Sequence, residues 1–261
     1  AARALAQAAE PDEQKLQAVR DAAAQVEPTD GAQVIYTTGS TGFPKPALLS
    51  HRNITCQNMC LAAAFEMTDE PRMLVNLPPS HVGCQAEQLM TTFFSGGTAV
   101  ILHIFDAEKS LDAIQKYRID CFGQIPALFN MQWRLPNYSD YDLSSLRFAL
   151  YGGQQVSRQF LEKLKTMAPN VGTGLGLTEM AGFVTYTPLG ADIDEIVDNV
   201  GFDMPVTPLT IRRPLNDDGT AGAALPDGEG GEICFAGPQV FLSYVYNVEA
   251  HRKTVSKEGI C

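Results

Sequence analysis

The 261-residue sequence lacks the features that mark several classes of protein. No apolar run approaches the roughly 20 residues that a membrane-spanning helix needs. Lysine and arginine together number 19, against 30 acidic residues, so the net charge is −11. Nucleic acids and anionic membranes attract clustered positive charge. The composition therefore argues against either as a partner, although a local phosphate site stays compatible with it.

The cysteines form no metal-binding pattern. Cys56 and Cys60 lie one helical turn apart, but no second Cys/His pair near them completes a zinc site. Scattered cysteines without a secretory signal are typical of a reducing compartment. We expect all six to be reduced thiols, mostly buried, in a cytoplasmic protein.

Three common catalytic motifs are also missing. A P-loop needs Gly-x4-Gly-Lys-Ser/Thr, whereas Lys45 follows Gly42 by three positions and precedes Pro46. The third glycine of a dinucleotide fingerprint starting at Gly172 would fall at Leu177. The Gly-x-Ser-x-Gly elbow of serine hydrolases does not occur.

What the sequence does contain is a loop rich in glycine and hydroxyl side chains, Tyr36–Lys45. The apolar run 34–36 predicts a strand before it, and Ser50 is a suitable N-cap for a helix after it. Glycines let backbone N–H groups turn toward a ligand, and hydroxyls and an ammonium add donors. The loop therefore suits a polyphosphate. Taken alone, a Gly/Ser/Thr cluster of this kind is more often a polar turn, and the lysine with the flanking strand and helix favours the phosphate site without deciding it.

Residues 31–187 alternate between strand and helix patterns. Such alternation predicts an α/β fold, with mostly parallel strands flanked by helices. Ligands of such sheets gather beyond the carboxyl ends of the strands. We expect strands over 73–77, 98–102, 120–125, 146–151 and 170–173, and helices over 50–65, 85–94, around 111–117, from 126, and over 157–167. The loop at 36–45, Gly152-Gly153 and 174–179 follow predicted strands and could converge on one site.

The two ends of the chain differ from this region. Residues 1–30 are alanine-rich and predict a helical lead-in. After about residue 187, short apolar segments at 209–211 and 232–235 are separated by the turn signals 216–219 and 226–228. We expect 188–261 to be part of a β-rich, barrel-like subdomain that ends in a short helix near 249–255.

Six ordered segments resemble the motifs of the adenylate-forming superfamily, which contains acyl-CoA synthetases, luciferases and peptide-synthetase adenylation domains. The loop resembles that family's signature Tyr-Thr-Ser-Gly-Thr-Thr-Gly-x-Pro-Lys-Gly. The other segments are Leu77-Pro78-Pro79-Ser80-His81, Tyr151-Gly152-Gly153, Leu175-Gly176-Leu177-Thr178-Glu179, Val200–Pro205 and Gly231–Tyr244. The resemblance covers roughly residues 33–255 and implies the large domain of an acyl-CoA synthetase.

The resemblance also implies roles for individual residues. Thr178 would contact the α-phosphate, Glu179 would coordinate Mg²⁺, and His81 would lie near the substrate carboxylate. The β- and γ-phosphates of ATP would be held by Thr37, Thr38, Gly39, Ser40, Thr41, Gly42 and Lys45. The adenine site and the adjoining acyl pocket would be lined by Gly152, Gly153 and Gln154, and the nucleotide would also contact Leu175, Gly176 and Leu177. On their own, His81 is compatible with a hydrogen-bonded core histidine and Glu179 with a surface carboxylate.

The sequence departs from the family pattern at several points. Pro46 replaces a glycine and removes one N–H donor, Leu175 replaces an aromatic residue, and Ser243 stands where glycine is common. We expect these changes to weaken ATP binding. The family's Thr-Gly-Asp segment and its C-terminal lid domain, with the catalytic lysine, are not found before Cys261. We therefore expect an internal piece of a longer protein that is inactive or weakly active by itself.

The expected activity is that of an AMP-forming carboxylate–CoA ligase, with ATP, Mg²⁺, a carboxylic acid and CoA as reaction partners. One alternative is an adenylation domain or acyl-AMP ligase that loads a carrier protein; another is a nucleotide-binding remnant without turnover. The acid is not readable from the sequence. Phe122, Gly123, Ala181 and Gly182 are the candidate walls of its pocket. The oligomeric state, a dimer included, is left open.

Overall fold

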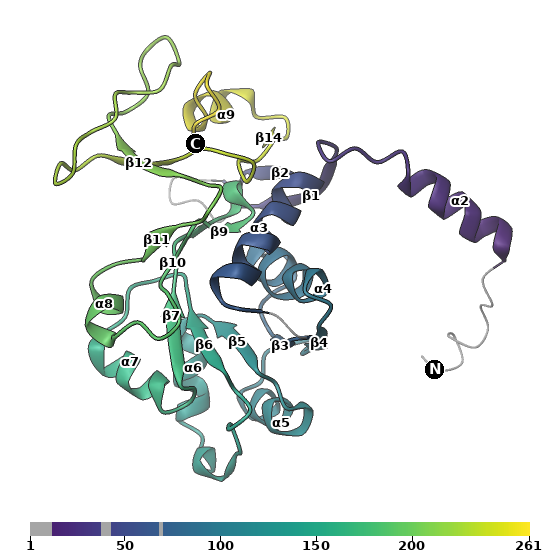
Figure 1. The fold of residues 1–261 in the computed structure, drawn as a ribbon, viewed down its shortest axis with the longest axis vertical. Coiled ribbons are helices and arrows are strands. Elements are labelled where there is room, and N and C mark those ends of the chain that lie inside the picture. The colour runs from purple at the N-terminus through teal and green to yellow at the C-terminus, as the bar shows by residue number, and fades with distance from the viewer. Residues whose placement is uncertain (1–11, 38–42, 68–69) are drawn as a thin grey trace.

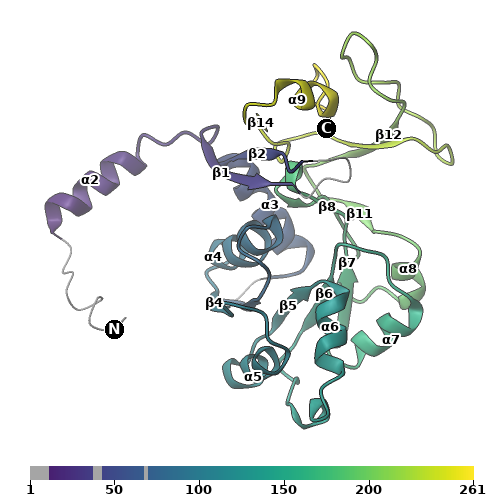
Figure 2. The ribbon, with the colours of Figure 1, turned by 180° about the vertical axis from the view of Figure 1, so that it is seen from behind.

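A five-stranded parallel sheet forms the body of the molecule (Figure 1). It is seen in a computed structural model that describes residues 12–37, 43–67 and 70–261. The strands run in the order β4-β3-β5-β6-β7, with bounds β3 Arg72–Val75, β4 Thr98–Ile101, β5 Cys121–Gln124, β6 Phe148–Tyr151 and β7 Asn170–Thr173. All five lie within or beside the predicted ranges, and helices cover both faces (Figures 1 and 2). The α/β prediction is confirmed.

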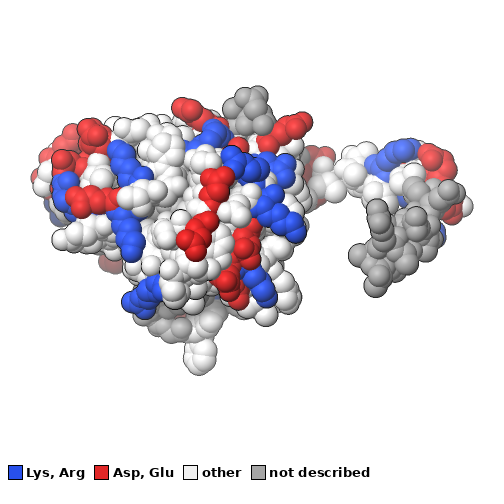
Figure 3. Space-filling view, turned by 90° about the horizontal axis from the view of Figure 1, so that it is seen from below, with Lys and Arg blue, Asp and Glu red and all other residues white. Residues whose placement is uncertain are grey.

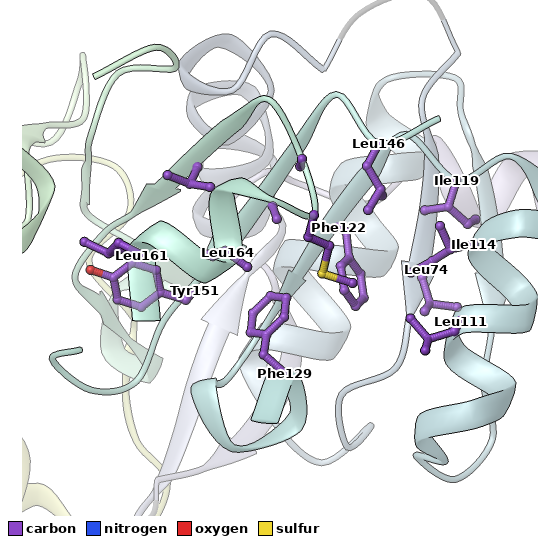
Figure 4. Packing of buried hydrophobic residues seen from close by; sticks show 14 of the residues in the cluster. Leu74, Leu111, Ile114, Ile119, Phe122, Phe129, Leu146, Tyr151, Leu161 and Leu164 are labelled. Atoms are coloured by element: carbon purple, nitrogen blue, oxygen red, sulfur yellow. The ribbon is translucent and has the colours of Figure 1, made fainter. Parts of the chain in front are cut away.

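Helices α5 (Ala107–Tyr117), α6 (Pro126–Trp133) and α7 (Arg158–Lys165) cover one face of the sheet. Alternate strand residues point to this side, because successive side chains of a strand face opposite ways. Leu74, Phe122 and Tyr151 pack there against Leu111, Phe129 and Leu161 (Figure 4). This face is a continuous apolar core.

The opposite face is covered by α3 (His51–Ala64), a π-helix at Gly83–Met90 and α4 (Thr91–Phe94). The intervening strand residues, such as Met73, Cys121 and Phe148, pack on this side. The helix predicted over 85–94 is present as the π-helix followed by α4. One turn of a π-helix holds more residues than a turn of an α-helix, and this rare form occurs mostly at functional sites.

The strand before the glycine-rich loop belongs to a separate sheet. β1 (Gly31–Tyr36) pairs antiparallel with β2 (Pro46–Ser50), and β2 pairs with β14 (Ser243–Tyr244). The expected strand–loop–helix arrangement is therefore wrong, because a second strand, antiparallel to the first, lies between the loop and α3. Pro46 is compatible with this strand because it is the first residue of β2.

The remaining strands form short antiparallel pairs. These are β8 (Gly176–Leu177) with β9 (Gly182–Phe183), β10 (Thr185–Tyr186) with β11 (Phe202–Asp203), and β12 (Leu209–Arg212) with β13 (Glu232–Phe235). The other helices are α8 (Ile193–Val197), α9 (Val248–Thr254) and the 3₁₀ turns Tyr138–Asp140 and Thr178–Met180. Since β14 joins the sheet of β1 and β2, packing crosses the domain boundary expected at residue 187.

Helix α2 (Glu13–Ala23) stands away from the body (Figures 1 and 2) and buries none of its residues. It lies within the helical lead-in predicted for 1–30, of which residues 1–11 fall outside the described part. Over the face seen from below, Lys and Arg side chains are interspersed with Asp and Glu (Figure 3). The charge of the chain is thus mixed over that face rather than separated by sign.

Candidate functional site

A cavity of about 490 Å³ lies where the two sheets meet. It is lined by residues from four of the predicted motifs: Thr37, Lys45, His81, Gly152, Gly153, Gly176, Leu177, Thr178 and Glu179. The expected convergence of these segments is therefore confirmed. Parallel topology alone does not explain this convergence, because Thr37 and Lys45 come from the antiparallel hairpin β1–β2.

The base of that hairpin places a cation at the mouth of the cavity. The Thr37 N–H donates to the Lys45 carbonyl at 2.9 Å, and the Lys45 N–H donates to Thr37 Oγ1 at 3.3 Å. The Lys45 ammonium lies 4.7 Å from the centre of the Tyr244 ring, within the range of a cation–π contact. The predicted phosphate residues Thr38, Gly39, Ser40, Thr41 and Gly42 lie outside the described residues.

Hydrogen bonds to both the side chain and the backbone of Glu179 fix its position. The Tyr244 hydroxyl donates to its carboxylate, and its carbonyl accepts from the Phe241 N–H at 2.8 Å. Burial and the neighbouring carboxylate raise the pKa of Tyr244, so the phenol stays protonated and continues to donate. The 3₁₀ turn Thr178–Met180 thus holds a carboxylate at the edge of the cavity.

The strand-end glycines leave room at the floor of the cavity. Gly153 has φ +87°, which favours glycine. A Cβ on Gly152 would lie 3.3 Å from the Phe183 ring. Gln154 and Leu175 do not line this cavity; they line an adjoining hollow of about 430 Å³ that shares Tyr151, Gly153 and Gly176 with it.

The deeper walls of the cavity are mostly apolar, with Leu61, Met67, Met73, Leu77, Val82 and Leu150. His81 stands between this part and the polar mouth. Its Nδ1 accepts from the Gly83 N–H at 3.0 Å, and burial lowers its pKa. The imidazole is therefore neutral near pH 7 and carries its proton on Nε2.

Two glutamines that line the cavity belong to a closed polar network. Gln88 accepts from the backbone N–H groups of Asn76 and Leu77, each at 3.2 Å, and donates to the Asn76 side chain and the Gly123 carbonyl. Gln124 accepts from Asn76 and donates to Gln132, both at 2.7 Å. Because these amides already have partners, they are walls rather than free binding groups.

The sequence analysis missed Glu87, which lies on the π-helix and also lines the cavity. Burial raises the pKa of this carboxyl to about 7, partly offset by the backbone N–H of Phe183. A signal was present: Glu87 is the single Asp, Glu, Lys or Arg between Arg72 and Asp106. A lone charge in a long uncharged stretch is a candidate for a partly buried functional group.

The predicted pocket walls are only partly correct. Gly123 lines the cavity. Phe122 precedes it in the strand and therefore faces the other side of the sheet, where it is fully buried. Ala181 is buried beside Ile35 and Leu49 rather than at the cavity surface. Gly182 lies behind Glu87, whose Oε1 would be 2.8 Å from a Cβ at that position.

The thiols match their prediction, since all six cysteines are free and four are buried. Among the described residues, none of the helices is long and apolar enough to cross a membrane. The same residues contain no group of three or more His, Cys, Asp or Glu side chains positioned to hold a metal ion. A cation at Glu179 would have to take its other ligands from a bound molecule or water.

The chain is 30% identical over 237 residues to a probable CoA ligase, CCL5, of Humulus lupulus, covering 88% of this chain and 42% of that protein. It is 29% identical over 221 residues to a feruloyl-CoA synthase of an Amycolatopsis species, covering 85% and 44%. The chain thus spans less than half the length of these relatives.

Solved structures show the same fold. ATP-bound MatB from Rhodopseudomonas palustris superposes with a TM-score of 0.77 at 24% identity, covering 92% of this chain and 48% of that one. The AMP-binding enzyme family matches residues 1–245. This match includes the hairpin, the parallel sheet and all the cavity residues described above, and the chain belongs to the AMP-binding enzyme family.

Proposed function

We propose that this chain is the central part of an AMP-forming carboxylate–CoA ligase. In the first step a carboxylate oxygen attacks the α-phosphorus of ATP, giving an acyl-adenylate and pyrophosphate. In the second, the CoA thiol attacks the acyl carbonyl and AMP leaves. The observation that carries the proposal is the single cavity in which Lys45, Thr178 and Glu179 stand at the mouth of an apolar pocket.

The residues at the mouth suit the charge of the first step. Both reactants are anions, so the site must offset charge on the attacking oxygen and on the leaving pyrophosphate. Lys45 and Thr37 would bind the β- and γ-phosphates together with residues 38–42, and Thr178 would bind the α-phosphate. Gly152, Gly153 and Gln154 would border the adenine. The neutral His81 would donate from Nε2 to the substrate carboxylate.

Glu179 fits a magnesium ion that arrives with the nucleotide. Mg²⁺ prefers oxygen ligands and is commonly held by one or two carboxylates plus substrate phosphates, and when bound it would neutralise charge on the phosphates. Tyr244 would keep the Glu179 carboxylate oriented toward the cavity. The single carboxylate at this edge is therefore compatible with a metal shared with ATP.

CoA is the favoured acceptor because the relatives named above are a probable CoA ligase and a feruloyl-CoA synthase. The test is carboxylate-dependent ATP–pyrophosphate exchange, measured with the natural protein that carries this chain and with the 261 residues alone. We expect exchange with the former and thioester formation when CoA is added. Exchange without any thioester would favour a carrier-protein acceptor. Absence of exchange with every acid would leave a nucleotide-binding protein without turnover.

A further inference from the structure

The carboxyl of Glu87 occupies a place built around it. A Cβ at Gly182 would lie 2.8 Å from Glu87 Cγ and Oε1, and Cβ atoms at Gly176 and Gly83 would each lie 3.4 Å from one of its oxygens. Three glycines from three segments therefore leave the space that this side chain fills. Any larger residue at Gly182 would push the carboxyl out of its position.

This carboxyl has no side-chain partner in the described part of the chain: no hydrogen bond and no ion pair joins it to another side chain there. That differs from Gln88 and Gln124, whose amides are engaged in the network with Asn76. The one polar contact of the Glu87 carboxyl among the described residues is the backbone N–H of Phe183, and a largely desolvated carboxyl with a single donor is costly. Such a group commonly marks a site where a ligand supplies the missing contact.

A polar group without a partner lies close by. The side-chain nitrogen of Gln57, a fully buried residue of α3, has no hydrogen-bond partner among the described residues. It would be 2.9 Å from a Cβ on Gly182, the same position that meets Glu87. An unpaired donor and a carboxyl with no side-chain partner thus border one small region beside the cavity.

The walls near Glu87 restrict what can satisfy it. Leu77, Val82 and Phe183 line the same cavity, and the neighbouring lysine, Lys45, is held over Tyr244 at the mouth. Besides the Phe183 N–H and the Gln57 amide, a further hydrogen-bond donor can come from a molecule bound in the cavity. In a largely apolar pocket, one polar group of this kind fixes orientation and selects among ligands of similar shape.

We propose that Glu87 is a specificity-determining residue that accepts a hydrogen bond from a hydroxyl or amino group on the body of the substrate acid. The inference rests on the proposed function, because it takes the apolar part of the cavity as the acyl pocket. It names the substrate class: compact acids that carry a hydrogen-bond donor away from the carboxylate, in preference to unsubstituted hydrocarbon acids.

The test compares benzoate with the three hydroxybenzoates and the three aminobenzoates, which place one donor at each ring position. With the natural protein that carries this chain, at least one substituted acid should exceed benzoate in kcat/KM for pyrophosphate exchange by about tenfold or more. Glu87→Leu should bring that ratio to one or below, and Glu87→Gln should give an intermediate ratio. Equal kcat/KM for all seven acids in the wild-type protein would overturn the proposal.

Two controls separate this result from other effects. Glu162→Gln removes a carboxylate on the exposed side of α7 and should leave the ratio unchanged. If Glu87 served only to pair with Gln57, Glu87→Leu would change thermal stability but not the ratio, which would contradict the proposal. If no acid supports exchange, binding of the same acids is measured by thermal shift instead. A preference for donor-bearing acids that Glu87→Leu abolishes would then support the role of Glu87, although the ligase proposal would fail.

Discussion

The two faces of the parallel sheet are built from alternate residues of the same strands, and they differ in how completely they are filled. On the face under α5–α7, Phe129 packs within 5.5 Å of Phe122 and 5.8 Å of Trp133, measured between ring centres. On the opposite face, Gly123 and two methionines line the cavity. Aromatic rings fill the first face, whereas small and flexible residues border open space on the second.

The largest expected effect is on the filled face. Phe129→Ala should lower the free energy of unfolding by about 3–5 kcal/mol, because a fully buried ring is replaced by a cavity. Urea denaturation followed by circular dichroism measures this loss. Exchange activity per folded molecule should stay unchanged, and a parallel loss of kcat would show that the two faces are not independent.

The next effect is on the cavity face. Lys45→Ala should slow pyrophosphate exchange by roughly 10²–10³-fold, since it removes a donor aimed at developing charge. The unfolding midpoint should change little, because Lys45 contacts the Tyr244 ring at a partly exposed position. The matched control is Lys163→Ala, which removes a comparable cation–π contact between Lys163 of α7 and Trp133 of α6. It should leave the exchange rate unaltered.

A smaller effect concerns pH. The pKa of Glu87 rises from 4.5 to about 7 on folding, so the folded chain binds more protons than the unfolded chain between these values. Stability should therefore fall as pH rises from 4.5 to 7, by at most about 3 kcal/mol from this group. Glu87→Gln should flatten that part of the curve of unfolding free energy against pH. Identical curves for both proteins would contradict the assignment.

The smallest effect tests the helix that covers the cavity face. Ser50 Oγ accepts from the Asn53 N–H at 3.1 Å, and Asn53 Oδ1 accepts from the Ser50 N–H at 2.7 Å, so both form a capping box at α3. Ser50→Ala should cost about 1 kcal/mol of stability in thermal unfolding. Ser157→Ala removes the corresponding cap of α7 on the filled face and should cost no more. Only the Ser50 variant should also weaken nucleotide binding.

The sequence predicted the elements whose signal is local, and it missed those that depend on partners remote in the chain. Strands such as β3 and β6 were found because both their faces are buried, which makes each a nearly continuous apolar run. β2 was missed because Ala47–Leu49 run directly into the helix cap at Ser50, and the strand's second partner, β14, is remote in the chain. Phe122 was misplaced because an apolar run does not show which side chains face which side of the sheet.

The site was predictable to the extent that its residues fall in ordered motifs. The positions of Thr178 and Glu179 after a strand predicted their place at the cavity. Glu87 carries no motif, and an isolated glutamate in a helix pattern is usually exposed. Its orientation depends on the π-helix and on three glycines, two of them more than 80 residues away, which no local pattern reveals.

The pairing of β2 with β14 also determines the order in which parts of the structure can form during synthesis. The Asn53 side chain donates to carbonyls of Pro238 and Val240, the former 185 residues later in the chain. At about 5–20 residues per second, a ribosome needs about 10 to 40 seconds to make that stretch. Until then Glu179 lacks Tyr244, and the hairpin that carries Lys45 has one unpaired edge. The nascent chain therefore completes its parallel sheet before it completes the proposed nucleotide site.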